Sequence, residues 1–208
     1  MEPIQAASDI NDERILRFNG FLGLVLYNSF HEELSKFLMA SYADLHFSSG
    51  MDLLLILCDA VPKEIMEELK PPPMTYVTGL SANITIVKRA MVVDELRRKF
   101  GINNRELPCL IFFSGAESKA GYRLPLGVDK SNYGKIFSEV CDAAHSVAVE
   151  TPPPYGQSVR DYQTWREKCF ERLFPLLRTM RLRLGFQKFV TQAPLGQIAS
   201  ALKIAHGG

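Results

Sequence analysis

Three short runs of this chain are apolar almost throughout, and they constrain the fold more than any other feature of the sequence. The runs are residues 21–27 (FLGLVLY), 53–58 (LLLILC) and 107–113 (LPCLIFF), and a shorter β-branched run covers residues 84–87. Continuous rather than alternating apolar residues are typical of strands that are buried on both faces of a sheet. Because 47% of the residues are hydrophobic, the chain can also supply the helices that cover such a sheet.

Segments with helical periodicity separate these runs. In residues 31–46 the apolar side chains recur at intervals of three and four, as on one face of a helix. Gly101 follows another such segment, at the position where a helix C-terminus favours glycine. The predicted helices are residues 31–46, 62–70, 91–100 and 132–149, and a last short strand covers residues 122–126. This alternation predicts an α/β fold with helices on the faces of a central sheet.

A proline-rich segment, residues 151–157, predicts a linker. It divides the chain into an N-terminal extension (1–20), a central domain (21–150) and a helical C-terminal extension (158–208). In the extension, residues 161–189 are predicted to be mostly helical with a kink at Pro175, and residues 195–204 form a shorter helix. From Arg160 onward there are nine lysines and arginines against three acidic residues, so the extension is basic.

The order of elements over residues 21–149 resembles that of the thioredoxin superfamily. Residues 25–30 (VLYNSF) resemble its first strand and helix, and residues 53–69 resemble the second strand with the helix that carries the active site. Residues 94–102, followed by 107–113, resemble the family's helix, Gly-Ile turn and proline-led strand. The resemblance implies a central mixed sheet flanked by helices, and a cis peptide bond before Pro108.

The chain departs from this family at the redox motif. Redox thioredoxins carry a C-x-x-C pair where the second strand meets its helix, but here that stretch is CDAVPKE, residues 58–64. No cysteine occurs between Asp59 and Leu107, so dithiol exchange is excluded at this position. The resemblance places Cys58 and Cys109 on adjacent strands, where they form a disulfide, a one-thiol site or two buried apolar side chains.

Other candidate chemistry is incomplete. Cys141 and His145 are four residues apart on a predicted helix, as metal ligands can be, but a zinc site needs further ligands that the sequence does not supply. His31, Glu32 and Glu33 resemble the start of a zinc-protease helix without its second histidine. We therefore expect no metal and no cofactor.

The C-terminal extension allows two interpretations. Its apolar residues, among them Trp165, Phe170 and Leu173, alternate with basic residues such as Arg166 and Arg178. Either the apolar face packs on the central domain and the basic residues are solvated, or the helix presents a basic surface to an acidic partner.

The sequence favours a redox-inactive thioredoxin-like adaptor or scaffold that binds a protein partner and is not an enzyme. One alternative is a one-cysteine oxidoreductase or transferase using Cys58 or Cys109. Another is a nucleic-acid accessory protein that uses the basic extension. The predicted contact residues are Cys58, Asp59, Val61, Pro62, Lys63, Leu107, Pro108, Arg178, Arg181 and Arg183.

Two features predict a cytoplasmic protein without a membrane span. Residues 1–19 are polar and charged, and every apolar run is far shorter than the ~18 residues expected of a spanning helix. The four cysteines are scattered without paired spacing, which is typical of reduced thiols in a cytosol.

Overall fold

A mixed five-stranded sheet forms the centre of the protein in a computed structural model, which describes residues 7–28, 30–57, 85–86, 90–115, 121–127 and 130–192. The strand order is β3-β2-β1-β4-β5. Strands β1, β2 and β3 are parallel, whereas β4 is antiparallel to β1 and β5 is antiparallel to β4. The strands are β1 (Phe21–Leu26), β2 (Leu53–Leu57), β3 (Thr85–Ile86), β4 (Cys109–Phe113) and β5 (Arg123–Pro125).

The three apolar runs are the three central strands, and every residue of β1, β2 and β4 is buried. The prediction of strands buried on both faces is therefore confirmed. The helices are η1 (Ala7–Asn11), α1 (Glu13–Leu16), α2 (Glu32–Ala40), α3 (Tyr42–Ser49), α5 (Ala90–Lys99), η2 (Asn104–Glu106), η3 (Lys130–Asn132), α6 (Tyr133–Glu150) and α7 (Val159–Gln192). No helix in the described ranges combines the length and apolar character needed to cross a membrane.

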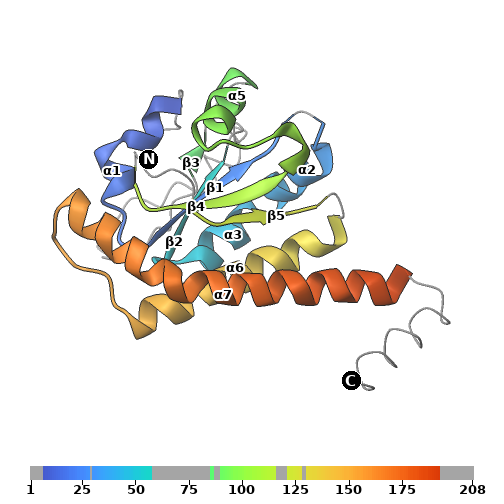
Figure 1. Ribbon diagram of the computed structural model, residues 1–208. Helices are drawn as coiled ribbons and strands as arrows, with labels where there is room; N and C mark the ends of the chain where they lie inside the picture. The colour runs from blue at the N-terminus through green and yellow to red at the C-terminus, as the bar shows by residue number, and fades with distance from the viewer. Residues whose placement is uncertain are drawn as a thin grey trace.

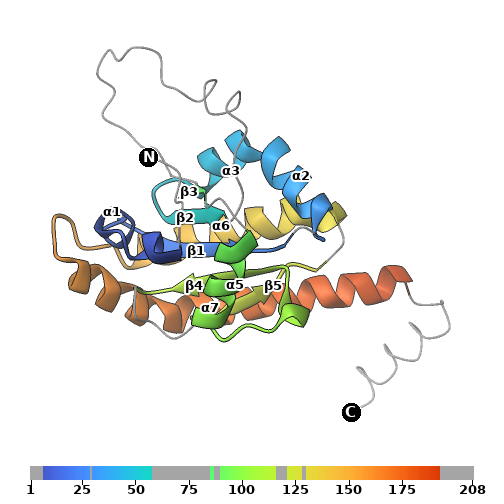
Figure 2. The ribbon, with the colours of Figure 1, turned by 90° about the horizontal axis from the view of Figure 1, so that it is seen from above.

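Helices cover both faces of the sheet. One face packs against α2, α3, α6 and α7, and the other packs against η1, α1 and α5. Figure 1 shows α5 on one side of the sheet and α6 and α7 on the other, and Figure 2 shows α5 lying over the sheet from above. The alternating side chains of β1 explain this arrangement, because Phe21 and Val25 join the first core and Leu22 and Leu24 join the second.

Some predicted helices are found with altered boundaries. Gly101 ends α5 at φ +61°, and the Ile102 amide donates to the Arg97 carbonyl at 2.8 Å, which is the expected glycine-terminated helix end. The prediction of one helix over residues 31–46 is wrong, because Ser41 ends α2 and begins α3. Serine competes with the backbone for hydrogen bonds and is a poor residue for a helix interior. The predicted helices at 62–70 and 195–204 lie outside the described residues.

The part of the C-terminal extension that the structure describes contributes to the core of the central domain. Trp165, Phe170, Leu173 and Leu177 of α7 are buried against the sheet, and Phe21 of β1 lies 5.0 Å from Trp165 between ring centroids. The N-terminal extension likewise buries Ile10, Ile15 and Leu16 in the core on the opposite face. The predicted boundaries at residues 20 and 158 therefore do not separate independent cores.

One expectation for α7 is wrong. Arg166 is not a solvated basic side chain but is fully buried, with no exposed surface. Its five N–H groups donate to backbone carbonyls at 2.5–3.1 Å, and the acceptors are Leu16, Phe18, Gly20 and Ser114. Burial lowers the pKa of the guanidinium to about 10, which still leaves it protonated at neutral pH. Arg166 therefore binds α7 to the segment before β1 and to the end of β4.

Candidate functional site

The chain leaves β1 next to Pro108. Leu26, the last residue of β1, pairs with Cys109, and β4 is antiparallel to β1. The segment after Leu26 therefore begins at the end of the sheet where Pro108 leads into β4. The Leu107–Pro108 peptide bond is cis.

The strand order differs from the one that the resemblance implied. Cys58 and Cys109 were expected on adjacent strands, but β1 lies between β2 and β4. The sequence pattern could not distinguish the two strands, because both are continuous apolar runs followed by a helical segment. The predicted contact residues Cys58, Asp59, Val61, Pro62 and Lys63 lie outside the described residues.

A compact turn connects β1 to α2. The side-chain oxygen of Asn28 accepts a hydrogen bond from the Phe30 amide at 3.1 Å, and its carbonyl accepts one from the His31 amide at 3.0 Å. Asparagine favours such turns because its side chain can bind the backbone two residues ahead. The backbone N–H of Asn28 donates to Nδ1 of His31 at 3.3 Å. The turn leaves the Phe30 residue 90% exposed.

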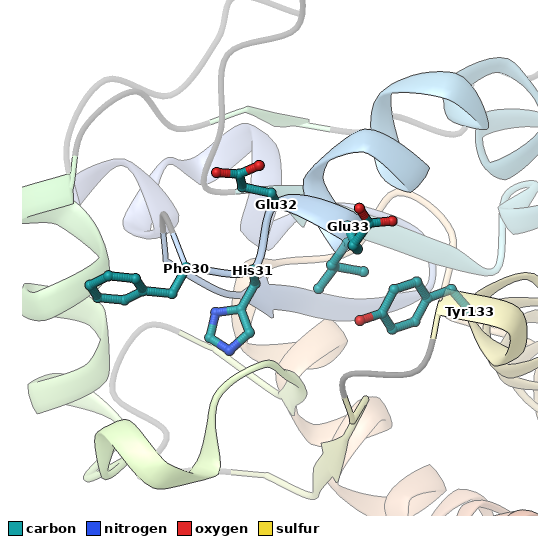
Figure 3. A pocket seen from close by; sticks show the side chains of 6 residues that line it. Phe30, His31, Glu32, Glu33 and Tyr133 are labelled. Atoms are coloured by element: carbon teal, nitrogen blue, oxygen red, sulfur yellow. The ribbon is translucent and has the colours of Figure 1, made fainter.

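A pocket of about 310 Å³ adjoins this turn. It is lined by Phe30, His31, Glu32, Glu33, Leu34 and Tyr133. Figure 3 shows Phe30 and Tyr133 at opposite ends of this group, with His31 between them. Tyr133 is the first residue of α6, and its hydroxyl donates to the Gly127 carbonyl at 3.1 Å. The pocket therefore lies between the start of α2 and the start of α6.

The polar groups of the pocket are mainly acidic. Glu32 and Glu33 occupy the first turn of α2, where negative charge is favoured by the helix dipole. Lys36 lies 3.5 Å from Glu32 and 3.8 Å from Glu33. His31 accepts a hydrogen bond at Nδ1, so in this arrangement Nδ1 is unprotonated and Nε2 carries the ring proton.

The remaining predicted contact residues are distributed differently from expectation. Leu107 and Pro108 are both buried, so their side chains offer little surface to a partner. Arg178 is exposed on α7. Arg181 and Arg183 belong to the same helix, but their side chains are outside the described part of the structure. Phe30 and Tyr133 were not predicted, and the only signal for Phe30 is a large apolar residue in an otherwise polar turn.

The described thiols are not suited to nucleophilic chemistry. Cys109, Cys141 and Cys169 are free and buried. Burial raises the pKa of Cys109 to about 12, with a further contribution from the charge of Glu106. A thiol with that pKa is protonated at neutral pH, whereas the thiolate is the reactive form. The burial of Cys109 therefore gives no support to a role as the nucleophile, and Cys58, the other candidate thiol, lies outside the described residues.

The Cys141–His145 pair also does not assemble a metal site. Cys141 is buried, whereas Nδ1 of His145 lies 2.7 Å from a carboxylate oxygen of Asp52. Within the described ranges, no group of three or more His, Cys, Asp and Glu residues could hold a metal ion.

Comparison with known proteins gives no relative. No protein-family model, no curated protein and no solved structure matches this chain.

Proposed function

We propose that this chain is a redox-inactive, thioredoxin-like module that binds a protein partner through the turn after β1. The observation that carries the proposal is Phe30, which is 90% exposed beside a pocket at the Pro108 end of the sheet. In the family that the sequence resembles, the groove beside the cis-proline accepts an extended peptide. The strand order around β1 supports this assignment.

The energy available from Phe30 supports a role as a binding anchor. A phenylalanine side chain buries roughly 150–250 Å² when it is fully covered. At about 25 cal/mol per Å², complete burial would contribute several kcal/mol before the costs of association. Aromatic side chains next to a pocket are common at the centre of protein interfaces, where few residues supply most of the affinity.

The chemistry of the turn supports binding rather than redox exchange. The residues after β1 are YNSFHEE, residues 27–33, and contain no cysteine. Cys109, which pairs with the last residue of β1, is held protonated by burial. The thioredoxin-like site therefore lacks both the dithiol and a reactive single thiol on β4.

Affinity capture with a matched pair of variants tests this function. Phe30→Ser removes the proposed anchor, and Phe47→Ser removes another exposed phenylalanine (76%) from α3. Each purified chain is immobilised in equal amounts and exposed to lysate under reducing conditions, and retained proteins are quantified by mass spectrometry. A specific partner should be retained by the parent and Phe47→Ser chains and lost with Phe30→Ser. If the three chains retain the same proteins in the same amounts, the proposal is wrong.

A further inference from the structure

We infer that the loop between α6 and α7 is a second docking segment, recognised by a partner whose groove is lined with aromatic side chains, as in WW domains. The loop contains three consecutive prolines and a tyrosine, residues 152–155 (PPPY), which we call the proline segment. Figures 1 and 2 show this loop at the end of the molecule opposite α2. The inference therefore goes beyond the proposed function, because it assigns a different surface and a further partner.

The sequence constrains the backbone of the proline segment to a polyproline II helix, the conformation that such grooves bind. Each proline ring fixes φ near the value of this helix, and a residue before proline is biased towards the matching ψ. Pro152 and Pro153 meet both conditions, since each is a proline followed by another proline. In the structure, residues 152–154 belong to no helix, strand or turn. Gly156 follows at φ +66°, a conformation that favours glycine, where the chain bends after the segment.

The exposure of the side chains matches the period of a polyproline II helix. This helix has three residues per turn, so residues three apart lie on the same edge. Pro152 and Tyr155 are three apart and are both exposed, with Tyr155 at 69%. The two prolines between them are half-buried. One edge of the proline segment therefore presents a proline ring and an aromatic ring to solvent.

Hydrogen bonds fix both ends of the loop. At the first end, the Thr151 carbonyl accepts from Nε1 of Trp165 at 2.9 Å, and Trp165 is buried in the core. At the other end, the Ser158 backbone N–H donates to the Asp161 carboxylate at 3.0 Å, just before α7 begins. A segment that is already held in its bound conformation loses less conformational entropy when a partner binds it.

The spacing of the prolines favours one kind of aromatic groove. The pattern P-x-x-P, which SH3 domains bind, requires two prolines three residues apart. No proline of the segment is followed by another at that distance, and the residue three after Pro152 is Tyr155. A tyrosine after two or more prolines instead suits a WW domain, whose groove takes an aromatic side chain beside the proline rings.

Titration of the full chain with two purified domains tests this inference. The probe is a WW domain that selects two prolines and a tyrosine, and the comparison probe is an SH3 domain that selects P-x-x-P. Calorimetry should show that the WW domain binds, and that the SH3 domain binds at least about tenfold more weakly because its second proline is missing.

Variants assign the binding to the proline segment. Tyr155→Ala should weaken binding of the WW domain at least about tenfold, because an aromatic anchor is lost. Pro152→Ala should weaken it about threefold, because alanine neither presents the ring nor fixes φ. Pro175→Ala is the matched control, since Pro175 is an exposed proline of α7 outside the segment, and this variant should bind like the parent chain. Thermal unfolding of each variant is the control for folding.

Four results would overturn the inference. They are no binding of the WW domain at millimolar concentration, unchanged binding in Tyr155→Ala, an equally tight complex with the SH3 domain, and an equal loss in Pro175→Ala. Phe30→Ser separates the inference from the proposed function, because this variant should bind the WW domain like the parent chain. If WW binding persists while no captured protein depends on Phe30, the proposed function fails and the docking segment stands. In the reverse case the loop is only a linker, and the proposed function stands.

Discussion

The chain is buried just before strand β1 and exposed just after it. Before its first residue, Phe21, the backbone carbonyls of Leu16, Phe18 and Gly20 are bound by the buried guanidinium of Arg166. After its last residue, Leu26, the chain makes a turn that exposes Phe30 and opens onto a pocket. We call these the closed end and the open end of β1. The same strand therefore begins at a buried, fully hydrogen-bonded polar cluster and ends at a turn with an exposed aromatic side chain.

The difference separates what stabilises the fold from what is available to a partner. At the closed end, each donor of Arg166 has an acceptor and the side chain has no exposed surface. Polar groups that are buried and satisfied in this way fix a structure but cannot contact another molecule. At the open end, an exposed aromatic side chain costs solvation free energy unless something covers it. Changes at the two ends should therefore affect different properties.

The largest effect is expected at the closed end from Arg166→Met. Methionine keeps much of the apolar volume but leaves three buried carbonyl groups and one part-buried carbonyl group without their donors. The unfolding free energy should therefore fall by about 3–5 kcal/mol. Arg166→Lys should recover only part of this loss, because an ammonium has three donors rather than five. Urea unfolding followed by circular dichroism measures both.

Arg178→Met is the matched control on the same helix, since Arg178 is exposed. It should change the unfolding free energy by less than about 0.5 kcal/mol. Equal effects at Arg166 and Arg178 would mean that the closed end is not a stabilising cluster.

This contrast explains what the sequence could predict about α7. The apolar residues Trp165, Phe170 and Leu173 have helical spacing, which predicts one apolar face. In the structure these residues are buried against the central domain, in agreement with the first of the two interpretations. Arg166 and Arg178 could not be distinguished, because each is a basic residue in the same amphipathic helix. The acceptors of Arg166 are backbone carbonyls. Every residue has one, so the residue types in a sequence cannot identify these acceptors.

A second pair of variants compares the two ends with the same chemical change. A Cβ on Gly20, at the closed end, would lie 2.5 Å from the Asp52 carbonyl oxygen, so Gly20→Ala should destabilise the protein by about 1–3 kcal/mol. Gly134 follows Tyr133 at the open end, and its nearest neighbour would be a Phe37 ring carbon at 3.9 Å. Gly134→Ala should therefore stabilise α6 by up to about 1 kcal/mol. Thermal melting of both variants tests the comparison, and a similar shift in both would contradict it.

The order of the strands was less predictable than the strands themselves. The strands β1, β2 and β4 follow from continuous apolar runs, but their order in the sheet depends on pairing between distant segments. The prediction placed the site after β2, whereas pairing of Leu26 with Cys109 puts the turn after β1 beside Pro108. Local patterns define elements, and only tertiary structure defines which loops meet.

A third prediction tests whether the exposed region at the open end reaches the thiol of Cys109. Cys109 pairs with Leu26, yet burial raises its pKa to about 12 from an ordinary value near 9. Above pH 9 the unfolded chain releases this proton while the folded chain keeps it, so the unfolding free energy should fall as pH rises. We expect the parent chain to lose about 1 kcal/mol more than Cys109→Ala between pH 8.5 and 10, because the other buried thiols, Cys141 and Cys169, contribute equally in both chains. If the two chains have the same pH dependence, the Cys109 thiol is accessible and the open end extends into the sheet.

The smallest stability change is expected at Phe30, the residue that we propose as the binding anchor. Phe30→Ser removes a side chain of a residue that is already 90% exposed, so the folded state loses little burial. Its unfolding free energy should stay within about 0.5 kcal/mol of the parent value, although partner binding should be lost. Urea unfolding measured beside the capture experiment tests both statements on one protein sample. A loss of stability as large as that of Arg166→Met would show that Phe30 packs within the fold, and the two ends of β1 would then both be structural.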